Sequence, residues 1–125
     1  MIEFSVDLPN RPGQLAPLAR ELGEADINIR TLTAVTVGDQ GVVRLVVDDE
    51  SGARKVLTDA GVTFGERRIV SATLRDKPGA LADLADALAA GGTNIEALYL
   101  LSSNGPELRF AIAVDDPEYV GNGKS

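Results

Sequence analysis

One segment of this sequence occurs twice, and the repeat restricts the folds that the chain can adopt. Residues 10–15 read Asn-Arg-Pro-Gly-Gln-Leu and residues 76–81 read Asp-Lys-Pro-Gly-Ala-Leu, a displacement of 66 positions. The match continues without a gap, because Leu18, Ala19, Leu22, Asn28 and Ile29 recur as Leu84, Ala85, Leu88, Asn94 and Ile95. Two copies with so long a period do not suit a solenoid, which stacks many short repeats. The repeat therefore predicts a duplicated module.

The composition is that of a globular protein, with 44% hydrophobic and 25% charged residues in a chain of 125. No apolar run approaches the ~20 residues that span a bilayer, and no signal peptide opens the sequence. We therefore expect a cytoplasmic protein without a membrane partner. The absence of cysteine fits a reducing compartment.

Several kinds of site are disfavoured by the residues that are missing. The chain has neither histidine nor cysteine, which removes the commonest general base and the commonest transition-metal ligands. We expect no catalytic residues, no metal site and no cofactor. The aspartate pairs 48–49 and 115–116 are interpreted as charges at helix starts, with a metal site as the alternative. A net charge of −7 argues against a nucleic-acid partner, which would need clustered lysine and arginine.

The hydrophobic pattern of the first copy predicts the order strand, helix, strand, strand, helix, strand. Strands are expected at 2–8, 27–37, 42–47 and 62–66, and helices from Pro12 to about Gly23 and from about 50 to Gly61. The strand at 42–47 is mostly apolar, which favours a central position in the sheet. This order is that of the split βαβ or ferredoxin-like unit. The predicted fold class is α+β, duplicated, with antiparallel sheets that carry their helices on one face.

The second copy is predicted to be shorter than the first. It contains strand signals near 68–75, 93–102 and 107–114 and a helix signal at 78–90. We expect a first module at 1–67, a second module at 68–118 that lacks its last helix and strand, and a disordered tail at 119–125. Without a fourth strand, the strand at 68–75 would lie at an open edge, which favours pairing with another chain. We therefore expect a homodimer or a larger assembly.

The repeated motif resembles the ACT domain family. The Asn-Arg-Pro-Gly-x-Leu loop, the leucine-rich helix after it and the Asn-Ile pair that opens the next strand are similar to that family in both copies. The resemblance implies βαββαβ modules that bind amino acids and regulate metabolic enzymes. It covers residues 2–70 and 68–116, and a stand-alone tandem pair is an arrangement known among small ACT proteins.

The resemblance also implies a ligand site where two modules meet, between the loop of one module and the strand opening of the other. One site would combine Asn10, Arg11, Pro12, Gly13, Gln14 and Leu15 with Asn94 and Ile95, and its mirror would combine Asp76, Pro78, Gly79, Ala80 and Leu81 with Asn28 and Ile29. Serine-responsive members carry a histidine where this sequence has Leu8, so the expected ligand is a free, apolar amino acid.

Structural alternatives exist for the same residues. Asn10 and Asp76 are also common helix-capping residues, and Asn28 and Asn94 are common turn residues. Asn10 can donate and accept hydrogen bonds, whereas an ionised Asp76 only accepts and would repel a ligand carboxylate.

Three functions are compatible with the sequence. The first is a non-catalytic regulator that senses an amino acid. The second is a ligand-free interaction module of the same fold, such as a regulatory subunit of a metabolic enzyme. The third is a small ferredoxin-like hydrolase similar to acylphosphatase, with Arg11 in the matching loop, although the glycine pattern of that loop is absent. The ligand, the enzyme and the pathway are not specified by the sequence.

Overall fold

The chain divides into two compact units, each built on its own sheet. In a computed structural model, which describes residues 1–114, residues 2–67 form one unit and Arg68 onward, with Met1, forms the other. We call them the N-terminal and the C-terminal module. The expectations for 115–118 and for the tail at 119–125 lie outside the described residues.

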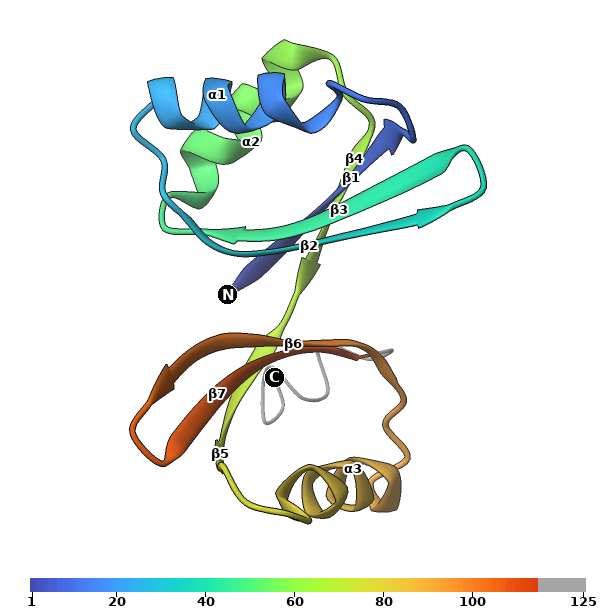
Figure 1. Ribbon diagram of the computed structural model, residues 1–125, viewed down its shortest axis with the longest axis vertical. Coiled ribbons are helices and arrows are strands. Elements are labelled where there is room, and N and C mark those ends of the chain that lie inside the picture. Colours follow the sequence, from blue (N-terminus) through green and yellow to red (C-terminus); the bar gives the residue numbers. More distant parts are fainter. Residues whose placement is uncertain (115–125) are drawn as a thin grey trace. The chain divides into compact units, whose positions relative to one another are not determined.

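The N-terminal module has the predicted ferredoxin-like order (Figure 1). Its elements are β1 (Ile2–Pro9), α1 (Leu15–Glu24), β2 (Ile29–Val37), β3 (Gln40–Val47), α2 (Glu50–Ala60) and β4 (Phe64–Arg68). The strands lie in the order β2-β3-β1-β4, and β3 pairs antiparallel with both β1 and β2. Both helices cover the same face of this sheet (Figure 1). The predicted central position of β3 and the fold class are confirmed.

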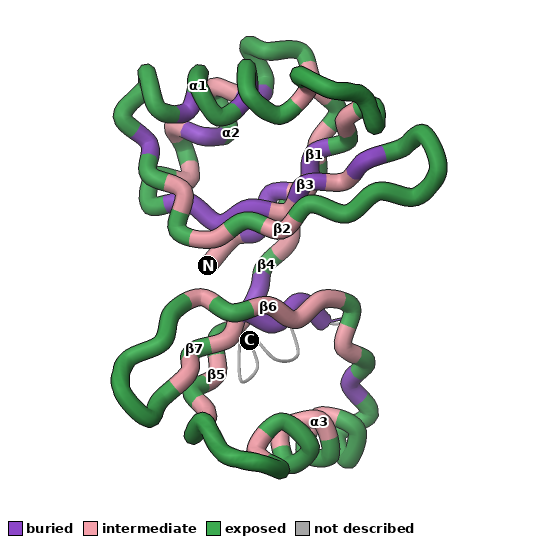
Figure 2. The backbone as a smooth tube through the Cα atoms, viewed as in Figure 1, coloured by how far each residue is buried: buried purple, intermediate pink, exposed green. Residues whose placement is uncertain are grey.

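The core of this module lies between the sheet and its two helices. Strands β1 and β3 pair with Phe4 opposite Leu45 and Val6 opposite Val43, so their apolar side chains share one face. The buried cluster, drawn in purple in Figure 2, consists of Phe4, Val6, Leu18, Leu22, Ile27, Val43, Leu45, Val47, Ala53 and Leu57. Helix α1 contributes Leu18 and Leu22, and α2 contributes Ala53 and Leu57, each pair one turn apart as in an amphipathic helix.

Both ends of α1 differ from the prediction. The helix begins at Leu15, not at Pro12, because Gly13 has a φ of +83°, which a right-handed helix does not contain. The helix does not stop at Gly23 but continues to Glu24. Asp26, with a φ of 63°, takes the left-handed position there, which short polar side chains tolerate. Helix α2 is as predicted: the Asp49 side chain accepts a hydrogen bond from the Gly52 N–H, and Gly61 follows the helix with a φ of 72°.

The C-terminal module repeats the first four elements of this arrangement within the described residues. It contains β5 (Val70–Arg75), α3 (Ala80–Ala90), β6 (Ile95–Asn104) and β7 (Glu107–Val114), and its strand order β5-β7-β6 corresponds to β1-β3-β2. Helix α3 also begins after its Pro-Gly pair rather than at it. Within residues 1–114, β5 lies at an edge of this sheet. None of the helices in this part of the chain is long and apolar enough to cross a membrane.

A buried carboxylate on the other face of the N-terminal sheet contradicts the strand pattern. Glu3 alternates with apolar residues along β1, a pattern typical of a strand with one solvated polar face, but its side chain is 0% exposed. Its Oε1 accepts hydrogen bonds from Arg67 Nη2 at 2.9 Å and Nε at 3.2 Å, and Arg44 Nη1 lies 3.5 Å away. Two arginines on β3 and β4 therefore compensate for the desolvation of this charge, which is costly when it is unpaired.

Replacing Glu3 should destabilise the protein far more than replacing Asp7, an exposed carboxylate of the same strand. Removing one partner of a buried ion pair costs about 3–5 kcal/mol when the remaining charge stays buried; the side chains of Arg44 and Arg67 are 28% and 23% exposed, which places the cost at the lower end of this range. We expect a loss of this order for Glu3→Gln and at most about 0.5 kcal/mol for Asp7→Asn, as is usual at exposed positions. Urea unfolding of both variants measures the difference, and equal midpoints would contradict this account.

Candidate functional site

The loop between β1 and α1 is fixed to the tip of the β2–β3 hairpin. The Asn10 N–H donates to the Asp39 carbonyl at 3.0 Å, and Asn10 Nδ2 donates to the Gly38 carbonyl at 2.8 Å. The capping alternative for Asn10 is wrong: Gln14 holds the N-cap position, and no side chain caps α1. Asn10 instead joins two segments that lie far apart in the sequence.

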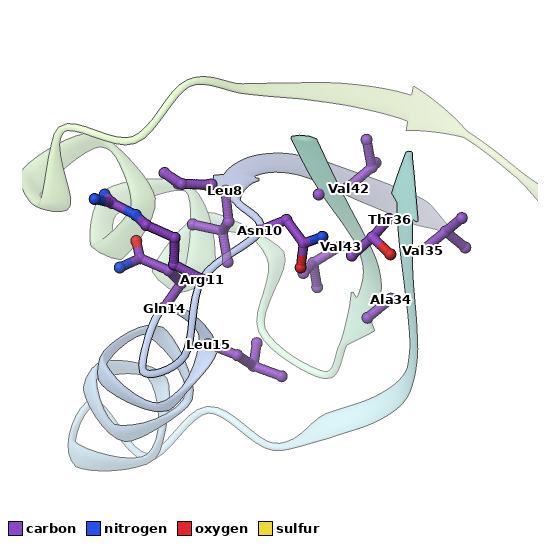
Figure 3. A pocket seen from close by; sticks show the side chains of 12 residues that line it. Leu8, Asn10, Arg11, Gln14, Leu15, Ala34, Val35, Thr36, Val42 and Val43 are labelled. Atoms are coloured by element: carbon purple, nitrogen blue, oxygen red, sulfur yellow. The ribbon is translucent and has the colours of Figure 1, made fainter. Parts of the chain in front are cut away.

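A cavity of about 130 Å³ lies between this loop, the start of α1 and the β2–β3 pair (Figure 3). It is bounded by Leu8, Pro9, Asn10, Arg11, Gln14, Leu15, Ala34, Val35, Thr36, Gly41, Val42 and Val43. Most of these residues are apolar, and the polar ones belong mainly to the loop. An apolar cavity with a few polar groups at its margin is the usual form of a small-molecule site.

Small residues on β2 and β3 leave the space for this cavity. Gly41 is buried and pairs directly with Leu8. A Cβ at Gly41 would lie 3.0 Å from the Leu8 carbonyl oxygen, so any larger residue would press on the β1 backbone. On the neighbouring strand β2, Ala34 pairs with Val43 of β3. Because the side chain of Ala34 is only a methyl group, this edge of the cavity stays open.

The side chains of the loop divide into two groups (Figure 3). Asn10 and Leu15 point toward the β2–β3 pair, whereas Arg11 and Gln14 point away from it. Arg11 therefore contributes its backbone and a nearby positive charge rather than a guanidinium inside the cavity. Since the Nδ2 of Asn10 is bonded to Gly38, its Oδ1 is the atom that can accept a hydrogen bond from an ammonium group.

The start of α1 favours an anionic group. The first N–H groups of a helix have no partner within it and carry partial positive charge. The first turn of α1 contains no acidic residue that would repel an anion. Pro17 in that turn has no N–H, so the backbone N–H groups available to a ligand are those of its neighbours, including Leu15 and Ala16. Apolar walls, an amide oxygen and a helix N-terminus together suit a small molecule with apolar, ammonium and carboxylate groups.

The second loop has the same backbone with different side chains. The Asp76 N–H donates to the Pro106 carbonyl at 2.8 Å, as Asn10 does to Asp39, and Gly79 has a φ of +89°. An ionised Asp76 cannot make the side-chain bond that Asn10 makes to Gly38. Helix α3 also carries Asp83 in its first turn. The start of α3 is therefore less favourable for a carboxylate than that of α1.

The remaining predicted residues lie elsewhere in the two modules. Asn28 sits at the opposite end of β2 from the cavity, where its N–H donates to Asp48 Oδ1 at 3.0 Å. Gly13 borders a second hollow, on the α2 side of the loop, and Pro12 is exposed. Pro78, Ala80 and Leu81 belong to the second loop and the start of α3, and Asn94 and Ile95 to the start of β6. The combination of each loop with the other module's Asn-Ile pair stays a prediction.

Sequence analysis missed the strand side of the cavity. Ala34, Thr36, Gly41 and Val43 were assigned to strands or to a turn and not to the site. The available signal was Gly41, a glycine at the start of an otherwise apolar strand, which often marks a close backbone approach.

Charged groups elsewhere do not form a second centre. Within residues 1–114, no three acidic side chains lie close enough together to hold a metal ion. The hydrogen bond from Arg54 lowers the pKa of the Glu66 carboxyl, but this pair is exposed and neither residue borders the cavity.

Comparison with known proteins identifies the family. The sequence pattern described as an ACT domain pair matches residues 1–118. The chain is similar in structure to protein BT0572 from Bacteroides thetaiotaomicron, with 28% identity and a TM-score of 0.83 over 91% of this chain and 78% of that one. No curated protein matches the sequence.

Two further solved structures share the fold at lower identity. The ligand-free regulatory subunit of aspartate kinase from Thermus thermophilus is 18% identical, with a TM-score of 0.68 over 96% of this chain and 85% of that one. The corresponding subunit from Thermus flavus is 20% identical, with the same TM-score and coverage.

Proposed function

The chain belongs to the family of ACT domain pairs, and from this premise we propose that it is a non-catalytic regulatory protein that binds a free amino acid. The proposal depends on one observation above all, the cavity beside the Asn10 loop. Its apolar walls suit an apolar side chain, and its margin suits the charged α-groups. The same loop is the part of the sequence that resembles the ligand-binding loop of ACT domains.

The proposed contacts follow from the geometry of the first loop. The ligand carboxylate lies at the start of α1, its ammonium donates to Asn10 Oδ1, and its side chain lies against Leu8, Leu15 and Val43. Asn94 of a C-terminal module is the proposed additional contact. The mirror arrangement would combine the second loop with Asn28, and its Asp76 makes it the weaker of the two. The proposed location is the cytoplasm.

A second candidate function is supported by the surface of β2. This edge strand exposes Leu32, Val35 and Val37, the last at 76%. Exposed apolar residues on an edge strand are typical of a surface that binds another protein. In this alternative the chain is a ligand-free regulatory subunit of a metabolic enzyme, a role that the related fold of the aspartate kinase subunits allows.

A screen of the twenty amino acids separates the two functions. A ligand that binds only the folded state at ten times its Kd adds about 1.4 kcal/mol to the free energy of unfolding. For modules of this size, in which 1 kcal/mol shifts Tm by about 4–8 °C, that corresponds to a rise in Tm of about 6–11 °C. We expect such a rise for apolar L-amino acids, with the D-isomers as controls. No rise for any amino acid at millimolar concentration would leave the ligand-free alternative.

Asn10→Ala should weaken binding more than Asp76→Ala. A hydrogen bond to a charged group is worth about 1.5–3 kcal/mol, so loss of the Asn10 oxygen should raise Kd by at least tenfold. Removing Asp76 also removes a negative charge from the second loop, so its effect should be smaller. Titration calorimetry on both variants measures this difference, and a larger loss at Asp76 would show that the loops are ranked wrongly.

The protein should assemble into a homodimer or a larger oligomer. Strand β5 lies at a sheet edge within the described residues, and such an edge offers backbone groups to a second chain. Light scattering at tens of micromolar should give at least twice the chain mass of 13.1 kDa. A monomeric mass across a dilution series would rule out this assembly.

A further inference from the structure

The two modules differ at the positions that leave space for the cavity. In the N-terminal module Leu8 pairs with Gly41, and Ala34 pairs with Val43. In the C-terminal module the corresponding pairs are Leu74 with Leu108 and Leu100 with Phe110. The correspondence comes from strand pairing and not from sequence similarity, which is weak in this segment.

All three differences place a larger side chain in the C-terminal module than in the N-terminal module. Glycine, alanine and valine in the first module are replaced by leucine, leucine and phenylalanine in the second. Each replacement adds about three or four carbon atoms at the same place on the sheet, and close-packed proteins leave little room for such additions. Leu108 and Phe110 are partly buried, so their larger side chains leave less room at these positions, whereas Leu100 is 46% exposed.

The charges beside the two loops also favour a ligand at the first loop. The first loop carries Asn10 and Arg11, and α1 has no acid in its first turn. The second loop carries Asp76 and Lys77, and Asp83 follows in the first turn of α3. A ligand carboxylate is therefore favoured at the first loop and disfavoured at the second.

The size of the cavity limits the ligand side chain. An apolar cavity of about 150 Å³ in another protein holds one benzene molecule, and the cavity here is about 130 Å³. This volume is close to that of a branched aliphatic side chain, and the cavity is open at its edge, where Ala34 and Val35 are exposed. Its walls are mostly apolar and include Leu8, Leu15 and Val43, and Thr36 is the one polar residue on the strand side, so the lining favours an apolar side chain.

We propose that the chain binds one branched aliphatic amino acid, that only the N-terminal module binds it, and that Gly41 and Ala34 determine both the site and its size limit. This inference rests on the proposed function, and it adds the ligand class, the stoichiometry and the residues that set them. The second loop then has a structural role in its module. Its backbone hydrogen bond to the hairpin, from the Asp76 N–H to the Pro106 carbonyl, serves the fold without a ligand.

Titration calorimetry of L-leucine with the full chain tests the inference. We expect one L-leucine per chain and at least tenfold weaker binding for Ala34→Leu. Ala34 is exposed on an edge strand, so leucine is tolerated there by the fold. The matched control is Leu100→Ala at the corresponding position of the C-terminal module, which should change Kd by less than about twofold, since Leu100 is not among the proposed ligand contacts. Circular dichroism confirms that both variants are folded.

Each contrary result has a definite meaning. Two molecules per chain, unchanged binding by Ala34→Leu, or a large loss with Leu100→Ala would overturn the single site in the N-terminal module. Tighter binding of L-tryptophan than of L-leucine would overturn the size limit, while the proposed function would stand. If none of the twenty amino acids binds, the proposed function itself fails, and this inference fails with it.

Discussion

The antiparallel pairing of β1 with β3 is the constraint on which the rest of the N-terminal module depends. This one register places Phe4 and Val6 beside Leu45 and Val43, and so builds the face that the two helices cover. Its last pairs bring Leu8 opposite Gly41 and Pro9 opposite Gln40, which sets the hairpin tip beside the loop. A shift by one residue would reverse every side chain of β1 between the two faces. The core and the cavity are thus consequences of the same pairing.

Much of this fold follows from the sequence, because the repeat and the hydrophobic periods agree at every element. The errors occur where local preference and local geometry compete. Pro12 is well suited to a first helical turn, but the left-handed φ of Gly13 delays the helix to Leu15. Glycine is a common helix terminator, but Asp26 provides the left-handed residue and Gly23 stays helical. At both ends of α1 more than one residue is suited to begin or end the helix, and the sequence pattern does not show which of them does so.

The candidate site was predictable only on its loop side. The loop is marked directly by a sequence motif that recurs at the start of a helix. The residues that form the strand side of the cavity, in contrast, depend on which residues of β3 pair with Leu8 and Val6. The pairing register of the strands is set by long-range packing, which one sequence does not reveal. Gly41 and Ala34 were therefore not recognised as residues that line the cavity. The burial of Glu3 was missed for the same reason. Alternation describes the two faces of a strand, but it does not reveal that Arg44 and Arg67 meet over one of them.

Comparison of the two modules separates the residues that the fold requires from those that shape a site. The leucine stripe at Leu18 and Leu22 recurs as Leu84 and Leu88, and the loop bond from Asn10 to Asp39 recurs from Asp76 to Pro106. These residues anchor a helix and a turn, so a change in either copy would weaken that module. The positions around the cavity diverge between the modules: larger apolar residues stand there in the C-terminal module, where the β6–β7 pairing shifts register between Leu100 and Ser102. An empty apolar space forfeits packing contacts that the larger residues provide, so glycine and alanine at Gly41 and Ala34 make the N-terminal module less densely packed than it could be. A ligand side chain of matching size would restore those contacts, which couples the stability of this module to the occupancy of its cavity.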